Sequence, residues 1–591
     1  MAARSFLRTW LFLSALLFAC SFSGPVSGFA QTGTSKANRG IEIQPQIAEG
    51  RPIHLVYVHL EKSTGDPAGD DALRRQVAGA LRISQGAPFR QFIAGFGLKR
   101  VQQLTSVQSA ELKIYEAVPS GQVVVALLVS PLEEAAVVPP KAKGILATGQ
   151  IRDFPTLFQN DRSKFVFILN GGAGIFSDTD PWFGGYGEAF NGSNPTAEDP
   201  LGSGTSTWIE GYIEPGFGGV LQLSDYPLYS YGAVSYLMSG TDGHDIYNSG
   251  TWGYGDFEKL YAGFIWDLPG KNSLVDVSIG KQVYQLRDGF LLSKVPVSTS
   301  IGERAALYLG PRLTSENTLL VRANAFGVGL DAFLIEPSEL DEIATNTQLA
   351  GLNLQYQFSN IDAALTYFYV PDSESFYRKP DGRLLPREGL RTFNPSLSMT
   401  KIFGLDGAWI KAEYAYQNHE DFSMSAHAGY VWFGYQAQNL NWRPSLSYRW
   451  SMFTGDDPDT ETFERFDPLF SGGLGNFLPG IVFSKVYKNA NLITNRATFS
   501  VKPEDTLELI LDYFHHRADD LNNLGGIGPL QALESKDIGQ EVTLTALHYI
   551  GKHFFLQGIG SVGIPGEAIE RAVGGDADNW YTLQAALYMF F

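Results

Sequence analysis

Apolar and polar residues alternate along most of this chain, in segments of about ten residues. In one such segment Leu446, Tyr448 and Trp450 share one face, while Ser447 and Arg449 share the other. Successive side chains of a β-strand point to opposite sides, so this period of two predicts strands with a single apolar face. A soluble β-sandwich also alternates, but its strands are shorter and its outer faces are charged. Tyr and Trp near the segment ends favour a transmembrane barrel, in which aromatic residues gather at both membrane interfaces.

Eighteen segments with this pattern predict an all-β transmembrane barrel of about 18 antiparallel strands over residues 164–591. The predicted strands are 164–176, 206–223, 228–239, 256–268, 273–283, 303–312, 317–327, 346–358, 361–370, 391–402, 408–418, 425–437, 442–453, 493–502, 506–516, 538–550, 553–563 and 579–591. Tight turns are predicted at Pro269 to Asn272, Thr314 to Asn317, Ser359 to Asn360, Pro503 to Asp505 and Gly551 to Lys552. Nearly every other connection is long, and an even strand number then puts the short turns in the periplasm and the long loops outside.

The end of the chain also favours a barrel. Leu583, Ala585, Leu587 and Met589 form an apolar row that ends on the aromatic Phe591. This row resembles the C-terminal signal by which outer-membrane barrels are recognised for insertion. Closure of the sheet pairs every backbone N–H and C=O, which lets strands cross a bilayer without helices. We therefore expect a protein of the outer membrane of a Gram-negative bacterium.

Residues 1–30 have the features of a secretory signal peptide. Two arginines precede the apolar run from Leu11 to Ala19, and Gly28 to Ala30 supply a small-x-small cleavage site. A lipoprotein signal that ends at Cys20 is the alternative, although Phe18 fits that motif poorly. Cys20 is the only cysteine, which excludes an intramolecular disulfide and a cysteine-based zinc cluster.

A different periodicity precedes the barrel, in residues 51–131. It predicts a strand, two helices and two further strands, at 53–60, from Asp70 to Leu81, from Phe89 to Leu98, at 110–118 and at 122–129. The order β-α-α-β-β and the Gln85-Gly86-x-Pro88-Phe89 break resemble a polypeptide-transport-associated (POTRA) domain, and a generic small α+β domain is the alternative. Residues 132–163 have no clear period, and we expect a linker there.

Composition narrows the classes of function. The 44 Lys and Arg residues against 62 Asp and Glu give a net charge of −18, so the chain lacks the cationic field that tracks nucleic acid. No stretch beyond the signal approaches the roughly 18 consecutive apolar residues of a transmembrane helix. The chain also lacks the His-Glu-x-x-His, Gly-x-Ser-x-Gly and phosphate-loop motifs. We therefore expect neither an enzyme nor a bound cofactor.

Two pairs of segments resemble the alginate export family of outer-membrane barrels. The first pair is Ile279 to Gln282 with Asp288 to Leu291, and the second is Thr454 to Pro458 with Phe466 to Phe470. The resemblance covers residues 164–591 and implies a monomeric 18-stranded barrel through which an anionic polysaccharide such as alginate diffuses outward. Protein translocation is the alternative, because POTRA domains also precede barrels with that activity, and a general diffusion porin is the third.

A pore selects its substrate through charge and width at its constriction. The inward faces of the predicted strands carry basic residues that would offer weak, exchangeable sites to a polyanion. These bases are Lys259, Arg322, Lys411, Arg449 and Arg496. The inward acids are Glu210, Asp276, Glu413, Glu508 and Asp512. The alternative is that the bases only pair with neighbouring acids; Arg449 and Arg496 are the first candidates, because their strands flank the longest external loop.

Two loops carry further candidate residues. Candidates for a gate that folds into the pore are Asp288, Gly289 and Phe290 in one loop, and Asp467 and Pro468 in another. An ordinary surface loop is the alternative for the first of them. The acids Asp456, Asp457 and Asp459 form a weak candidate Ca²⁺ site, although a solvated acidic loop explains them better because no full EF-hand spacing is present. No other metal site is expected.

The expected partners follow from this architecture. They are an anionic polysaccharide, the lipid of the outer membrane and a periplasmic component of synthesis or secretion. The POTRA-like domain would lie in the periplasm and bind that component by adding a strand to the edge of its sheet. Nucleic acid is not expected as a partner.

Overall fold

The computed structural model describes most of the chain after residue 41. The described residues are 42–591 without 44, 49–50, 52, 63–66, 82, 84–88, 105, 117–122, 132–155, 161, 184–203, 224–227, 247–248, 269–272, 294–303, 326–327, 340–343, 359, 472–475 and 552. The predicted signal peptide, most of the predicted linker and the turn at Pro269 to Asn272 lie outside them. Within this part of the chain, no helix is long and apolar enough to span a membrane.

The first described unit is a small α+β domain. Its elements are α2 (Pro45–Ala48), β1 (Ile53–Leu60), α3 (Pro67–Leu81), α4 (Gln91–Gln102), β2 (Val107–Glu116) and β3 (Val123–Pro131). From β1 onward they follow the predicted β-α-α-β-β order. The sheet order is β1-β3-β2, with β1 parallel and β2 antiparallel to β3. Ile43 and Ala48 are buried in the same core as Val77 and Leu127, so the domain begins before residue 51. Its assignment as a POTRA domain stays a prediction.

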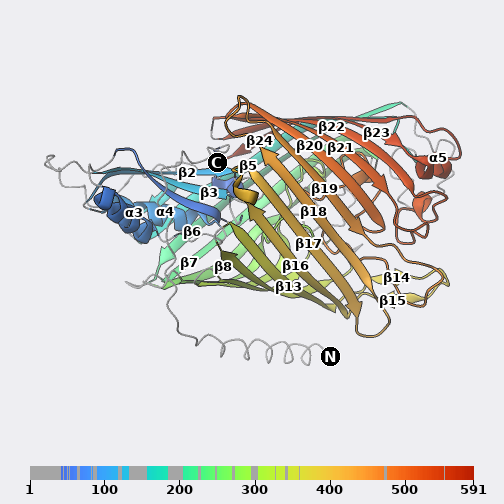
Figure 1. Ribbon diagram of the computed structural model, residues 1–591, viewed down its shortest axis with the longest axis horizontal. Coiled ribbons are helices and arrows are strands. Elements are labelled where there is room, and N and C mark those ends of the chain that lie inside the picture. The colour runs from blue at the N-terminus through green and yellow to red at the C-terminus, as the bar shows by residue number, and fades with distance from the viewer. Residues whose placement is uncertain are drawn as a thin grey trace. The chain divides into compact units, whose positions relative to one another are not determined.

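The larger unit is a closed antiparallel barrel of eighteen long strands (Figure 1). They are β5 (Ser163–Thr179), β6 (Thr205–Gln222), β7 (Leu228–His244), β8 (Ser249–Leu268), β9 (Ser273–Gln282), β10 (Ser315–Ala325), β11 (Val328–Glu336), β12 (Gln348–Phe358), β13 (Ile361–Asp372), β16 (Leu390–Thr400), β17 (Ala408–His419), β18 (Ala426–Gln436), β19 (Ser445–Phe453), β20 (Leu492–Glu504), β21 (Leu507–Arg517), β22 (Asp537–Ile550), β23 (Phe554–Pro565) and β24 (Trp580–Phe590). Pairing of β24 with β5 closes the barrel. The short β4 (Thr156–Gln159) also pairs with β5, so the predicted linker ends in a strand.

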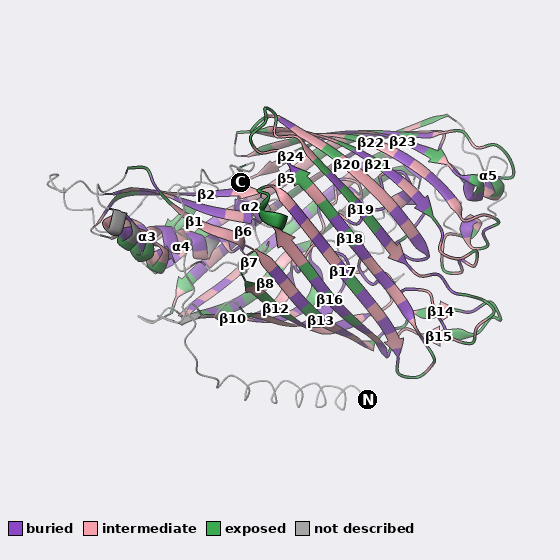
Figure 2. Ribbon diagram, in the orientation of Figure 1, coloured by how far each residue is buried: buried purple, intermediate pink, exposed green. Residues whose placement is uncertain are grey.

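Burial confirms which face of each strand meets the membrane. On β19, Leu446 is 62% exposed, whereas Arg449 on the opposite face is 2% exposed. Figure 2 shows buried and exposed positions alternating along strands such as β18 and β19. Large apolar side chains thus cover the outside, where lipid replaces water, and polar side chains point inward.

One predicted strand is wrong, and one strand was missed. Residues 304–314 belong to the connection before β10, and Ala305 and Ala306 have positive φ angles. The missed strand is β11, whose second half from Ala332 to Ile335 is apolar on both faces because its inward Phe333 and Ile335 are buried in the core that loop A shares with the wall. Apolar and polar residues therefore do not alternate in that part of the strand. The two errors cancel in the count, and the predicted tight turn at Thr314 to Asn317 instead leads into β10.

Candidate functional site: the barrel lumen

Two external connections fold into the barrel. We name residues 283–314, between β9 and β10, loop A, and residues 454–491, between β19 and β20, loop B. Phe290 of loop A and Phe477 of loop B both pack against the inward Tyr430, with ring centroids 5.1 and 4.8 Å away. A backbone bridge joins Leu292 to Phe470. The two loops therefore pack together inside the lumen.

These loops share one hydrophobic core with the inner wall of the barrel. Phe290 is fully buried, and so is Phe466 of loop B. The wall contributes apolar side chains from neighbouring strands to the same cluster: Leu320, Phe333, Phe368, Trp409, Tyr430 and Trp432. Burying a Phe side chain stabilises by about 1.5–3 kcal/mol, so this packing holds both loops in the pore.

Buried carboxylates of the wall fix the backbone of both loops. Glu210 on β6 accepts the backbone N–H groups of Tyr308 and Leu309, at 3.0 and 2.9 Å. Glu258 on β8 accepts two further N–H groups in loop A. Glu541 on β22 accepts three consecutive N–H groups of loop B, from Ile481 to Phe483. Backbone donors that would otherwise be orphaned in the lumen are thereby satisfied.

A buried ion pair ties loop B to the strands that close the barrel. Lys485 Nζ lies 2.5 and 2.7 Å from the two carboxylate oxygens of Asp178 on β5. Thr582 on β24 donates to the same carboxylate and accepts from Lys485. Lys485 also lies over the rings of Tyr308 and Trp580, 5.4 and 5.2 Å from their centroids. The ammonium group is thus held by charge and by aromatic faces together.

A second buried pair joins loop B to the loop before β16. The Arg387 guanidinium binds both oxygens of the Asp467 carboxylate, at 2.7 and 2.8 Å. The Tyr377 hydroxyl and the backbone N–H of Leu469 donate to the same carboxylate. Burial by itself raises the pKa of Asp467, but Arg387 and these donors hold it below its ordinary value. Asp467, predicted as a gate residue, is therefore a charged anchor of loop B.

Four of the five predicted bases are paired with carboxylates. Lys259 binds Glu214, Arg322 lies 3.7 Å from Asp276, Lys411 lies 2.7 Å from Asp288, and Arg496 binds Asp512 at 2.8 and 2.9 Å. The predicted acid Glu508 lies 3.6 Å from Lys502. The predicted bases and acids among these residues lie on the inward faces of their strands, and pairing cancels much of their charge.

Arg449 differs from the other four. Its guanidinium has no carboxylate within ion-pair distance among the described residues and is 2% exposed. It lies over the rings of Trp432 and Phe477, at 5.6 and 4.6 Å, and donates to the backbone oxygen of Asn476 in loop B. Arg496, its neighbour on β20, donates to the same oxygen at 3.2 Å. Two guanidinium groups thus converge on one oxygen acceptor.

Residues 256–582 match the sequence model of the family described as alginate export. The chain belongs to the alginate export family. The family and the closed barrel together make it an outer-membrane channel for polysaccharide export. None of the curated proteins compared with the chain matches it.

Three solved structures resemble this alginate export family barrel. OmpF of Salmonella typhi, in a complex with daunomycin, is 13% identical, covers 73% of this chain and 99% of its own, and has a TM-score of 0.35. OccAB4 of Acinetobacter baumannii is 10% identical, with 72% and 97% covered and a TM-score of 0.41. OpdQ of Pseudomonas aeruginosa is 9% identical, with 72% and 97% covered and a TM-score of 0.42.

The other predicted gate residues lie in the inward loops of the alginate export barrel. Gly289 has a φ of +83° at the turn before Phe290, a conformation that suits glycine. Pro468 is half-buried beside Asp467. Glu413, predicted to line the path, accepts a hydrogen bond from the Tyr430 hydroxyl at 3.2 Å beneath loop A. Inward folding is thus present, and movement of these loops stays a prediction.

The acids of the weak Ca²⁺ prediction do not converge. Asp456 accepts the backbone N–H of Glu464 and lies 4.0 Å from Lys379, while Asp457 accepts the N–H of Asp459. Across the described residues, no three His, Cys, Asp or Glu side chains gather in a group that could hold a metal ion.

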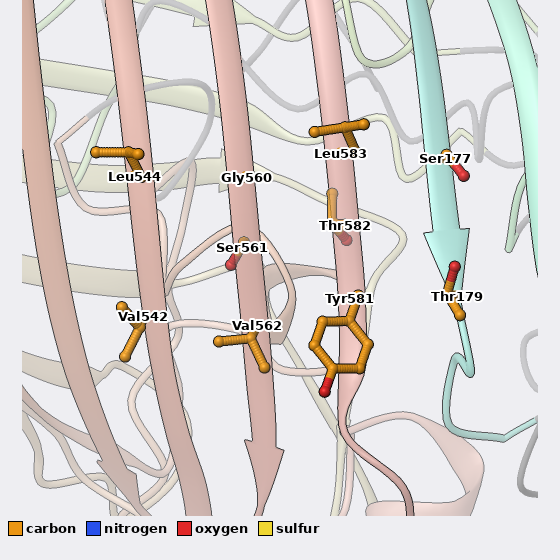
Figure 3. Close-up of a pocket in the computed structure, with 10 residues that line it drawn as sticks. All are labelled: Ser177, Thr179, Val542, Leu544, Gly560, Ser561, Val562, Tyr581, Thr582 and Leu583. Carbon is orange, nitrogen blue, oxygen red and sulfur yellow. The ribbon is translucent and has the colours of Figure 1, made fainter.

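A groove on the outside of the barrel is separate from the lumen. It has a volume of about 540 Å³ and spans β22, β23, β24 and β5. Figure 3 shows the apolar side chains of Leu544, Val562, Tyr581 and Leu583 around Gly560, which has no side chain to fill the space. This face meets lipid, so the groove is not part of the export path.

Sequence reasoning missed several lumen residues. Lys485, Arg387, Arg304 and Arg312 lie in connections between strands, where the inward or outward direction of a side chain has no period. For the residues of loops A and B, the length of these loops was the one signal in the sequence that could have pointed to a functional role, since long loops without secondary structure often carry function.

Proposed function

We propose that the barrel exports an anionic polysaccharide by passive diffusion, and that no bond is made or broken in the process. The observation that carries this proposal is the convergence of Arg449 and Arg496 on the Asn476 oxygen. A guanidinium group that donates to a neutral carbonyl oxygen donates more strongly to a carboxylate, because the carboxylate carries a negative charge. The acidic sugar of a polyuronate supplies such a carboxylate on every residue.

The pairing of the other lumen bases with acids supports passage of the polymer rather than tight binding of it. Lys259 and Lys411 are already paired with acids, so a passing polyanion meets them as weak and exchangeable sites. A channel conducts only when each binding step is weak enough to reverse. Arg449, which lacks a carboxylate partner within the described structure, would then be the strongest single site. Loop B must shift for the polymer to replace Asn476.

Replacing both Arg449 and Arg496 by Ser should weaken block of the channel by oligouronates. We expect the half-blocking concentration to rise by about tenfold or more, because a hydrogen bond to a charged group contributes about 1.5–3 kcal/mol. The anion preference should also fall. The measurement is single-channel conductance in a planar bilayer, with reversal potentials and added oligogalacturonate. Arg383→Ser, in an exposed external hairpin, is the matched control.

Two results would contradict the export proposal. One is a cation-selective wild-type pore that oligogalacturonate does not block, which would favour protein translocation. The other is equal block by neutral oligosaccharides of the same length, which would favour a general diffusion porin.

We infer further that the small domain lies in the periplasm and binds a secretion component along β1. In the described structure β1 pairs with β3 on one side only, so its other edge offers backbone groups for strand addition. Protease added to intact cells should leave this domain uncut, and cleavage should begin once the outer membrane is permeabilised. Cleavage in intact cells would place the domain outside.

A further inference from the structure

Loop A carries two arginines that share one tyrosine ring. The guanidinium carbons of Arg304 and Arg312 lie 5.6 and 4.6 Å from the centroid of Tyr254, an inward residue of β8. Ser239 on β7 connects both residues, since its hydroxyl donates to the Arg304 backbone oxygen at 2.7 Å and accepts from Arg312 at 2.8 Å. The two side chains therefore form one cluster on the wall of the lumen.

Among the described residues, no carboxylate lies within ion-pair distance of either guanidinium. Within the described part of the chain, the hydrogen-bond partners of these two groups are neutral: Ser338 for Arg304 and Ser239 for Arg312. The Nε atoms of both arginines are buried and have no hydrogen-bond partner. Arg304 is only 4% exposed, so bulk water does little to solvate its charge. A buried charge normally requires a partner of opposite sign.

The two charges also repel each other. Burial lowers the pKa of Arg312, the nearby Glu258 opposes this effect, and the Arg304 charge lowers the pKa further. Glu258 cannot neutralise the cluster fully, because its carboxylate already accepts the backbone N–H groups of Leu313 and Thr314. An anion placed between the guanidinium groups would satisfy the free donors and remove the repulsion.

We propose that Arg304 and Arg312 form an oxyanion-binding site, with Tyr254 as its floor. The ligand chemistry is a carboxylate or sulfate group, whose oxygens match the fork of a guanidinium. The apolar ring face of Tyr254 suits the C–H groups of a sugar that carries this charge. That the anion is part of a polymer rests on the proposed export function; that an oxyanion binds does not.

The test uses the full-length protein folded in detergent and two probes, sodium sulfate and trigalacturonate. Binding is measured by isothermal titration calorimetry for wild type, Arg304→Gln/Arg312→Gln and the control Arg383→Gln. We expect the double variant to bind each probe that the wild type binds at least about tenfold more weakly, because a charged hydrogen bond is lost at each position. The control should bind as wild type does. If the double variant fails to fold, the single variant Arg312→Gln gives the same comparison, because its side chain is half-buried.

The two probes separate the sources of the anion. Binding of sulfate and trigalacturonate with similar affinity supports a general oxyanion site, and binding of trigalacturonate alone supports a site that also reads the sugar. Unchanged binding of both probes in the folded double variant would overturn the inference. If sulfate binding is lost in the variant while oligouronates fail to block the wild-type channel, the site stands and the export proposal falls.

Discussion

Replacing Asp178 by Asn will destabilise the folded barrel by about 3–5 kcal/mol, the cost of leaving a buried charge without its partner. Lys485 is buried, and Asp178 supplies both oxygens that neutralise it. Asn has the same shape but carries no charge. The measurement is the free energy of unfolding in urea, followed by tryptophan fluorescence of the barrel in lipid vesicles.

The pair also offers an internal check. The double variant Asp178→Asn/Lys485→Met removes both charges, and we expect it to recover most of the lost stability, because apolar replacement of a buried pair is often neutral. Glu567→Gln breaks an exposed pair with Arg571 and should leave stability unchanged. If Asp178→Asn unfolds at the same urea concentration as wild type, loop B is not anchored through Lys485.

Replacing Arg387 by Met will weaken the anchor of loop B, so that the channel opens at a higher pH than the wild-type channel does. Asp467 has a folded-state pKa below the ordinary value, so its pair with Arg387 stabilises loop B at every pH above the ordinary carboxyl value of about 3.9. This contribution is lost only as the pH falls through the lower, folded-state pKa. With loop B held inside the lumen, wild-type channels should therefore conduct weakly from neutral pH down to about 4.

Without Arg387 the pKa of Asp467 rises. Burial then acts on Asp467 without the opposing cation, so the carboxyl takes up a proton at higher pH and the anchor is lost in milder acid. The measurement is open probability in a planar bilayer between neutral pH and strong acid. Arg383→Met, at an exposed pair with Asp381, is the control and should follow wild type. Identical pH profiles for Arg387→Met and wild type would show that this pair does not hold loop B.

Loops A and B supply partners for charged side chains on the inner wall of the barrel. Strand parity correctly placed Lys411 and Arg496 inside the barrel, but it could not show that Lys411 binds Asp288 of loop A. Arg449 and Arg496 were predicted as neighbours, and they hold a backbone oxygen of loop B. The residues that restrict the pore are therefore not those of the strands alone.

The barrel could be predicted from the alternation of apolar and polar residues along the chain. All but one of the predicted strands overlap an observed one, because the outward face of a membrane strand must be apolar at every second position, and this requirement is local. The missed strand β11 breaks the rule for a tertiary reason, since its inward Phe333 is buried under loop A. A strand can therefore be predicted from the sequence where contact with lipid is the only reason for its apolar residues.

The contacts inside the barrel could not be predicted in this way, because they join residues that are far apart in the chain. Lys485 and Asp178 are 307 residues apart in the chain, and Arg387 and Asp467 are 80 apart. A loop residue has no period that tells inside from outside, so nothing local marks these partners. Arg304 and Arg312 share the ring of Tyr254 because loop A turns inward and wall carboxylates such as Glu210 fix its backbone. Their juxtaposition depends on how the closed barrel confines its loops.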